Sequence, residues 1–367
     1  MRYVYRKKAY KILFSVVDTL GWIVSCPRVL FRRSGDIYPK KLLIIRLDHI
    51  GDVVGATAVL APLRKYFPGT SVHMMVPSCA EELIAPLPYV DRAVKFDAPW
   101  FRRGGHSGEG WFSGVKHMAA LIKAGDYDTV IDLRGDFRHI LAIFLAGVKN
   151  RIGYGITGGG FLLTNCVPCE GVEHETFRAL KLLGPLGIHA GPSPTEVPVT
   201  SAYRENAAAL KKDLGIGGRY AVIHPVPGHS SKNWKTGYFS DLIVGISRMG
   251  MTPVIIGASG DREIVYNIIE RSGVEAKDIA GKTSLGTMAA IMAGAEVFVG
   301  VDSGPAHISA ALCTPTVIIF GGANDPDQWA PKGDNVKVLY PGRDKDLSLV
   351  TPEDVLRAVE EVSCKLK

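Results

Sequence analysis

Short apolar runs alternate with amphipathic segments through most of the chain. "KLLIIRL", "SVHMMV" and "DTVIDLR" are such runs in the first half, with helix-like segments between them. Apolar runs of strand length separated by helical periodicity are typical of buried parallel strands with helices on both faces of the sheet. The first half is therefore predicted to be a parallel-sheet unit of the α/β class.

Proline, glycine and serine gather at 187–200, where the alternation pauses. It restarts with "YAVIHPV" and continues to "PTVIIFG", and the last segment is predicted to be a helix capped by Thr351 with Pro352 in its first turn. A pause of this composition is typical of a linker. We therefore expect four parts, at 1–35, 36–195, 196–345 and 346–367.

The N-terminal part has basic ends and an apolar middle from Ile12 to Val24. That middle is short for a membrane span and contains Asp18, whose charge would be costly at the centre of a bilayer. An amphipathic helix lying in the membrane interface is favoured. The alternatives are a helix packed on the body of the protein, export through a signal peptide whose lipoprotein-like cleavage box ends at Cys26, and a membrane span.

The amino-acid composition indicates which classes of ligand the protein could bind. Lys+Arg 43 exceed Asp+Glu 36, a formal charge of +7 that suits phosphate-bearing ligands, nucleic acid or an anionic membrane surface. No Lys/Arg tract interleaved with aromatic residues runs through the body of the chain, so nucleic acid is not an expected partner. Six cysteines do not make a disulfide framework here, and Cys166 and Cys169 lack a convincing fourth ligand, so no metal site is expected.

Three segments carry weaker signals. The glycines, arginines and aromatic residues at 98–114 predict an exposed, mobile loop, either a tolerated insertion or a contact for an anionic or amphiphilic partner. "GYGITG" at 153–158 matches G-x-G-x-x-G, with Glu173 and Glu175 at a suitable distance, but no helix follows it. "AKDIAGKT" has Ala276 where a phosphate-binding loop needs glycine, so both motifs are predicted to be turns.

A phosphate site is expected where "VFVGVDSGPAHIS" passes from strand to helix. Asp302 ends the strand, Ser303 and Gly304 make the turn, and His307 lies one turn into the helix. Backbone N–H groups and the helix dipole at such a position favour an anion such as a diphosphate, although a capped helix start without a ligand would look the same.

Two other loops follow strands of the same unit. Gly228 and Lys232 lie in one, and Gly257 begins the other, in which Ser259 or Asp261 could contact a ribose. Loops at the carboxyl ends of parallel strands converge on a crevice, which is the usual position of the ligand in open α/β sheets.

The first apolar run is followed at once by Asp48, His49, Gly51 and Asp52. An unpaired carboxylate is costly to bury, so charged groups at this position indicate either a function or, for Asp52, a helix cap.

These residues resemble glycosyltransferase family 9, the ADP-heptose lipopolysaccharide heptosyltransferases and their relatives. The resemblance runs from about Lys40 to Pro331 and rests on "RLDHIGDVV", "RIGYG", "PGHSSKNW" and the long motif from Asp278 to Pro331. It implies the GT-B arrangement, in which two Rossmann-like parallel-sheet domains face a central cleft. The first domain would be the acceptor side, and the second would bind the nucleotide sugar.

The resemblance also implies roles for single residues. Asp52 falls on the catalytic base and Lys232 on the lysine that binds donor phosphate, while the diphosphate loop falls on Asp302, Ser303, Gly304 and His307. Ser259 stands where some family members have a ribose-binding glutamate, which leaves the base and sugar of the donor open. His49 would bind an acceptor phosphate or orient Asp52, and Gly51 would permit close approach of the acceptor.

The expected reaction is inverting, metal-independent sugar transfer without a cofactor. The favoured donor is ADP-heptose, and the acceptor is a lipid-linked saccharide, a lipopolysaccharide core or related glycolipid. The enzyme would be cytoplasmic, peripheral on the inner-membrane face. A GT-B sugar-nucleotide epimerase and a non-catalytic sugar-nucleotide-binding protein are the alternatives.

Overall fold

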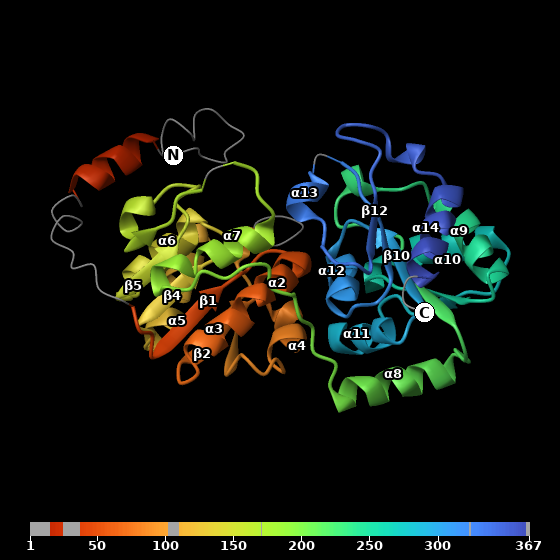
Figure 1. Cartoon of the computed structure of the whole chain (residues 1–367), viewed down its shortest axis with the longest axis horizontal. Coiled ribbons are helices and arrows are strands. Elements are labelled where there is room, and N and C mark those ends of the chain that lie inside the picture. The colour runs from red at the N-terminus through yellow and green to blue at the C-terminus, as the bar shows by residue number, and fades with distance from the viewer. Residues whose placement is uncertain (1–14, 25–36, 102–109, 170, 323, 365–367) are drawn as a thin grey trace. The chain divides into compact units, whose positions relative to one another are not determined.

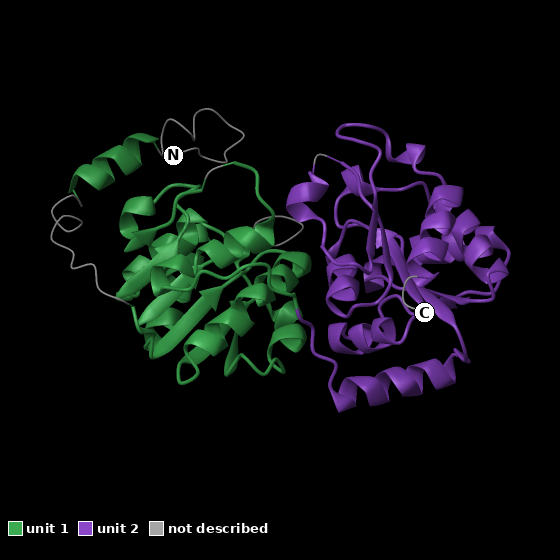
Figure 2. Ribbon diagram, in the orientation of Figure 1, with its two compact units in different colours: residues 1–195 green, residues 196–367 purple. Residues whose placement is uncertain are grey.

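The computed structural model describes residues 15–24, 37–101, 110–169, 171–322 and 324–364. The chain divides into two compact units, residues 1–195 and 196–367 (Figure 2), and the division falls inside the proline-rich segment at 187–200. Each unit is built on one six-stranded sheet (Figure 1).

The first sheet is parallel throughout and has the strand order β3-β2-β1-β4-β5-β6. Its register aligns Ile44 of β1 with Met74 of β2 and Ile131 of β4. The strands are β1 (Lys41–Ile45), β2 (Ser71–Val76), β3 (Arg92–Lys95), β4 (Thr129–Asp132), β5 (Asn150–Gly153) and β6 (Asn165–Cys166).

The second sheet is also parallel, with the order β12-β11-β10-β7-β8-β9. Counted from its own first strand, β7, this is the same order as in the first sheet. The strands are β7 (Tyr220–His224), β8 (Thr252–Ile255), β9 (Lys277–Asp278), β10 (Val297–Val301), β11 (Thr316–Ile319) and β12 (Val336–Leu339).

Helices connect the strands and cover the sheets. In the first unit they are α2 (Ile50–Ala56), α3 (Leu60–Tyr66), α4 (Glu81–Ile84), α5 (Trp111–Ala124), α6 (Phe137–Leu145) and α7 (Glu175–Lys181). In the second they are α8 (Ser201–Asp213), α9 (Thr236–Arg248), α10 (Arg262–Ser272), α11 (Leu285–Ala293), α12 (Gly304–Ala311), α13 (Pro326–Trp329) and α14 (Pro352–Cys364). Short 3₁₀ turns are η1 (Thr57–Val59), η2 (Ser78–Ala80), η3 (Pro99–Phe101), η4 (Gly160–Leu162), η5 (Gly184–Leu186), η6 (Ser230–Lys232), η7 (Ser259–Asp261) and η8 (Leu347–Leu349).

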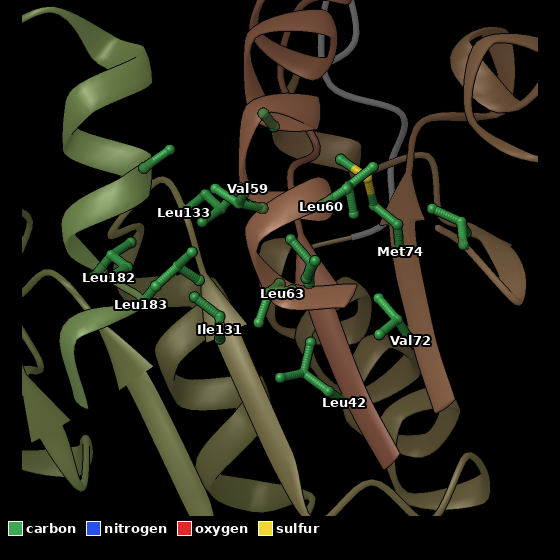
Figure 3. Close-up of a cluster of buried hydrophobic side chains, with 14 of the residues drawn as sticks. Leu42, Val59, Leu60, Leu63, Val72, Met74, Ile131, Leu133, Leu182 and Leu183 are labelled. Carbon is green, nitrogen blue, oxygen red and sulfur yellow. The ribbon is translucent and has the colours of Figure 1, made fainter. Parts of the chain in front are cut away.

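Alternate residues of β1 enter two different cores. Leu42 packs on one face of the sheet with Leu60 and Leu63 (Figure 3), whereas Leu43 and Ile45 pack on the other face in a cluster with residues of α5 and α6. Successive side chains of a strand point to opposite faces. A strand covered on both faces must therefore be apolar at every position, which is the pattern that the sequence shows.

The final helix, α14, belongs to the second unit. Thr351 Oγ1 accepts a hydrogen bond from the Asp354 N–H at 3.2 Å, so Thr351 caps the helix as predicted. Val355 and Val359 of α14 lie in one buried cluster with Phe239 of α9. The C-terminal residues thus complete the core of this unit.

The loop predicted at 98–114 is shorter at its C-terminal end. Residues 99–101 form η3, residues 102–109 lie outside the described residues, and α5 begins at Trp111. Gly114 was counted with the loop, but it lies inside the helix. A β-carbon there would come within 3.0 Å of Pro99 and Trp100, so the glycine permits close packing rather than a loop conformation.

Residues 15–24 form a helix, called here the N-terminal helix. The Asp18 carboxylate is buried and accepts a hydrogen bond from the Gly159 N–H at 2.8 Å, so this helix packs on the first unit. No helix in the described ranges is long and apolar enough to cross a membrane. The rest of the 1–35 segment, Cys26 included, lies outside the described residues.

Both apparent nucleotide motifs contain the predicted turn, although Gly153 ends β5 and Lys277–Asp278 forms β9. In "GYGITG" and the glycine that follows it, Gly158 and Gly159 have φ of 95° and 78°, a left-handed conformation that favours glycine. In "AKDIAGKT", Gly281 has φ of 67° and ends a turn after β9.

Candidate active site

Polar side chains gather at the carboxyl end of β1 in the first unit. Arg46 and Asp48 follow the strand directly, and His49 and Asp52 belong to the start of α2. The strand order reverses between β1 and β4, and ligands of doubly wound sheets bind beyond the strand ends at such a point.

Arg46 is the centre of this group and is buried. Its Nη1 donates to the Leu133 carbonyl oxygen at 3.2 Å, and its Nε lies 2.7 Å from Asp48 Oδ1. Its Nη2 lies 3.1 Å from Asp52 Oδ1 and 3.8 Å from Glu175 Oε2. One guanidinium group therefore pairs with two carboxylates of the segment after β1 and with one carboxylate of α7.

Pairing with carboxylates stabilises the buried charge of Arg46. Burial alone would lower the pKa of Arg46, but the carboxylates of Asp48, Asp52 and Glu175 outweigh it and raise the pKa above its ordinary value. For Asp48, burial raises the pKa of the carboxyl group, while Arg46 and Arg134 oppose that rise. A buried charge without such partners would be strongly destabilising.

Two more arginines complete the network. Arg134, which follows β4, pairs with Asp48 Oδ2, and its guanidinium carbon lies 4.3 Å from the centre of the Phe101 ring. Arg178 of α7 pairs with Glu175 Oε1. Three guanidinium groups thus pair with the carboxylates of Asp48, Asp52 and Glu175, and Arg134 also lies 3.8 Å from Asp136 Oδ2.

Asp52 makes contacts through both of its carboxylate oxygens. Oδ1 faces Arg46, and Oδ2 accepts a long hydrogen bond from the His49 backbone N–H at 3.3 Å and lies 3.3 Å from His49 Nδ1. The helix-cap interpretation is therefore correct in part. Asp52 is only partly exposed, whereas the His49 side chain is 74% exposed, so the imidazole lies on the solvent side of the carboxylate. Gly51 is buried in the first turn of α2.

The corresponding edge of the second unit holds a second ion pair. Lys232, in the loop after β7, has its Nζ 2.6 Å from Asp302 Oδ2, and Asn324 Nδ2 donates to the same oxygen at 3.3 Å. Asp302 follows β10 and is buried, while Lys232 is partly exposed. The strand order reverses between β7 and β10, so this pair also lies at a switch point.

Ser303 and His224 position the start of α12. Ser303 Oγ donates to the Val301 carbonyl oxygen at 3.0 Å and lies 3.0 Å from His224 Nδ1. Since a hydroxyl group has one proton, which Val301 receives, His224 Nδ1 is the donor to Ser303. Burial lowers the pKa of His224 to about 4, so the ring is neutral at neutral pH.

The remaining predicted donor residues lie around this edge. Gly304 is the first residue of α12 and His307 lies in its first turn. Gly228 is exposed in the loop after β7. A β-carbon on Gly257 would come within 3.2 Å of Asp261, whose carboxylate accepts from the Ala258 N–H at 2.8 Å.

Loss of His224 should change how stability depends on pH. Its folded pKa of about 4 lies below an unfolded value of about 6.5, so between these values the unfolded chain binds more protons and stability falls as pH is lowered. Between pH 7 and pH 5, the free energy of unfolding of His224→Asn should fall by about 2 kcal/mol less than that of the wild type. Urea denaturation at both pH values measures this free energy, and the exposed His229→Asn is the control, which should behave like the wild type. An equal fall in the wild type and in His224→Asn would contradict the prediction.

The sequence alone did not identify several of these residues. Arg46 and His224 end apolar runs and were visible as polar residues at strand ends. Glu175 and Arg178 were not recognisable, because α7 reaches Arg46 only through the fold, 129 positions along the chain. Asn324 and Arg134 likewise act through partners that are distant in sequence.

Aspartate pairs separated by one residue occur at 126–128, 325–327 and 344–346, a spacing that could serve a divalent cation. In each pair, at least one aspartate is bound by another group of the protein. Asp128 Oδ2 accepts from the Lys40 N–H, Asp325 caps α13 and pairs with Arg343, and Asp346 caps η8. Among the described residues, no group of three or more His, Cys, Asp or Glu side chains is placed to hold a metal ion.

The family profile and the curated relatives indicate the same family. The sequence profile of Glycosyltransferase family 9 (heptosyltransferase) matches residues 115–354. "Lipopolysaccharide heptosyltransferase 3" of Escherichia coli K12 is 28% identical, over 85% of this chain and 95% of that protein.

Solved structures of the same family share the fold. The glycosyl transferase family 9 protein of Veillonella parvula superposes with a TM-score of 0.78 at 21% identity, covering 89% of this chain and 98% of that one. The E. coli heptosyltransferase WaaC, solved with ADP, gives 0.71 at 22% identity, covering 88% and 99%. Two parallel, doubly wound sheets in one chain make the GT-B fold. With a profile match over more than half of its length, the chain belongs to glycosyltransferase family 9 (heptosyltransferase).

Proposed function

We propose that this protein is an inverting glycosyltransferase that moves heptose from ADP-heptose onto a lipopolysaccharide core or related glycolipid, with Asp52 as general base. The observation that carries the proposal is the position of Asp52. Its carboxylate lies at the switch point of the first sheet, with Oδ1 fixed by Arg46 and Oδ2 beside the exposed His49. The names of the family and of the curated relatives support the substrate class.

The chemical step is a single displacement. An acceptor hydroxyl group donates its proton to Asp52 Oδ2 as its oxygen forms a bond to the anomeric carbon. The bond from that carbon to the diphosphate oxygen breaks, and ADP leaves with the electron pair. The long contacts of Oδ2 to His49, at 3.3 Å, are weak enough for the acceptor to replace. We assign His49, through its exposed imidazole, and Gly51 beside it to the acceptor.

The donor diphosphate is assigned to the second unit. Lys232 and the N-terminal end of α12 supply positive charge and donors to the leaving group, the latter through the backbone N–H groups of Ser303 and Gly304 and the side chain of His307. An ammonium group has three donors, so Lys232 can bind a phosphate oxygen while keeping its 2.6 Å contact with Asp302. Gly228 and Gly257 would allow close approach of the nucleotide. These protein charges support a metal-independent reaction without a cofactor.

The protein is proposed to work at the cytoplasmic face of the inner membrane, as a peripheral protein. A lipid-linked acceptor lies in a bilayer, and the basic balance of the chain, +7, favours an anionic surface. Domains at 36–195 and 196–345 would hold the acceptor and the donor, respectively.

Titration calorimetry with ADP, UDP and GDP in the presence of chelator tests the donor assignment. We expect selective binding of ADP, because the similar E. coli heptosyltransferase WaaC has been solved with ADP and with ADP-2-deoxy-2-fluoro heptose, and we expect no effect of the chelator. Preference for UDP or GDP would contradict ADP-heptose as donor, and binding that needs added Mg²⁺ would contradict metal independence. Release of ADP from ADP-heptose only when acceptor is present would separate transfer from epimerisation.

A further inference from the structure

The N-terminal helix is amphipathic, but its apolar residues are exposed and its Asp18 is buried. At 3.6 residues per turn, its exposed apolar residues fall within an arc of about 120°, and Asp18 lies on the opposite face. We call this arc the apolar stripe; its members are between 38% and 80% exposed and are Val16, Val17, Leu20, Ile23 and Val24. A helix of a globular protein normally turns such a stripe toward the core.

The face of the helix that carries Asp18 and Gly21 is the one docked on the protein. Asp18 is 2% exposed and receives the Gly159 N–H at 2.8 Å. Gly21 lies against Phe161, where a β-carbon would come within 2.5 Å of the ring. The glycine-rich turn at 153–160 therefore receives the helix, and the docking fixes which face points outward.

The docked helix contacts a loop at the carboxyl ends of the strands, the side of the sheet that carries the proposed base. Gly159 follows β5, and Asp52 follows β1; both strands run parallel, so both residues belong to the carboxyl edge of the first sheet. A surface bound by the apolar stripe would therefore lie on the acceptor side of this unit.

We infer that the apolar stripe binds the lipid bilayer that carries the acceptor, an inference that rests on the proposed function for the identity of the acceptor. Exposed aliphatic side chains on a docked helix match the hydrocarbon boundary of a membrane. Residues 1–14, which precede the helix, contain five Lys or Arg residues and no Asp or Glu, which is complementary in charge to anionic lipid headgroups.

Flotation of the full-length protein with lipid vesicles tests this inference. We expect the wild type to float with vesicles of phosphatidylethanolamine and phosphatidylglycerol, and less with phosphatidylcholine alone. The variant Val16→Ser/Leu20→Ser/Ile23→Ser should lose about tenfold or more in lipid partitioning, because it removes the apolar contacts and keeps every charge. Three exposed apolar residues of the second unit give the matched control Ile264→Ser/Tyr266→Ser/Leu349→Ser, which should float like the wild type.

Two results would overturn the inference: equal flotation of the stripe variant and the wild type, or a wild type that does not float. In the second case, a wild type that sediments as a dimer and a stripe variant that sediments as a monomer would assign the stripe to a second copy of the chain. Thermal unfolding of each variant verifies that it is folded. Vesicle binding needs no catalysis, so a protein that floats but transfers no sugar would refute the proposed function and leave this inference standing.

Discussion

Asp52→Asn should abolish sugar transfer and leave ADP binding unchanged. The amide keeps the size of the carboxylate but cannot take the acceptor proton, so kcat/KM should fall by about 10²- to 10⁴-fold. The nucleotide is assigned to Lys232 and Asp302 of the second unit, whereas Asp52 belongs to the first unit. Release of ADP from the donor in the presence of acceptor measures the first effect, and calorimetry with ADP measures the second.

Two controls make this result specific. Asp97 lies at the carboxyl end of β3 in the same sheet and is exposed, with Oδ1 accepting from the Ser78 N–H at 2.8 Å, so Asp97→Asn tests loss of a carboxylate away from the switch point. His49→Ala removes the exposed imidazole beside Asp52 and should reduce the rate less. Full activity in Asp52→Asn would refute Asp52 as the base, whereas lost ADP binding would show that the substitution damages more than proton transfer.

The α/β fold could be predicted because the apolar pattern reports burial directly. A strand covered on both faces, such as β1 with Leu42 and Leu43 in separate cores, is a short apolar run in the sequence. The order of the strands was not predicted, because the rule of right-handed parallel crossovers limits the possible orders without selecting one. Local turns were also predictable, because they depend on the glycines that make them.

The site could be predicted only where its residues follow a strand. Asp52, Lys232 and Asp302 stand after apolar runs and belong to motifs of the family. Glu175 was considered only as part of a G-x-G-x-x-G motif, but it faces Arg46, because α7 packs beside α2. Contacts of this kind depend on tertiary packing, and no local pattern reports them.

The packing of the N-terminal helix also could not be predicted from the sequence pattern. Its apolar middle and Asp18 were visible in the sequence, and they favoured an interfacial helix over one packed on the body. The structure shows the packed helix, with Asp18 bound to Gly159, yet leaves the apolar stripe exposed. Single-sequence periodicity cannot separate these two arrangements, because both place Asp18 opposite the aliphatic residues.

Lys232→Ala should weaken ADP binding by about ten- to a hundredfold. A charge-assisted hydrogen bond to a phosphate contributes about 1.5–3 kcal/mol, which corresponds to that range of Kd. Loss of the ammonium also leaves the buried Asp302 carboxylate without the partner 2.6 Å away, so an incoming diphosphate would meet an uncompensated negative charge. Calorimetric titration gives the Kd of each variant.

A second substitution separates these two contributions. Asp302→Asn in the Lys232→Ala background removes the uncompensated charge and should recover part of the lost affinity, whereas a direct loss of the lysine–phosphate contact would remain. Lys235→Ala, three positions away and exposed, is the matched control and should bind ADP like the wild type. Wild-type affinity in Lys232→Ala would remove Lys232 from the donor site, and the dipole of α12 would then be the main source of positive charge for the diphosphate.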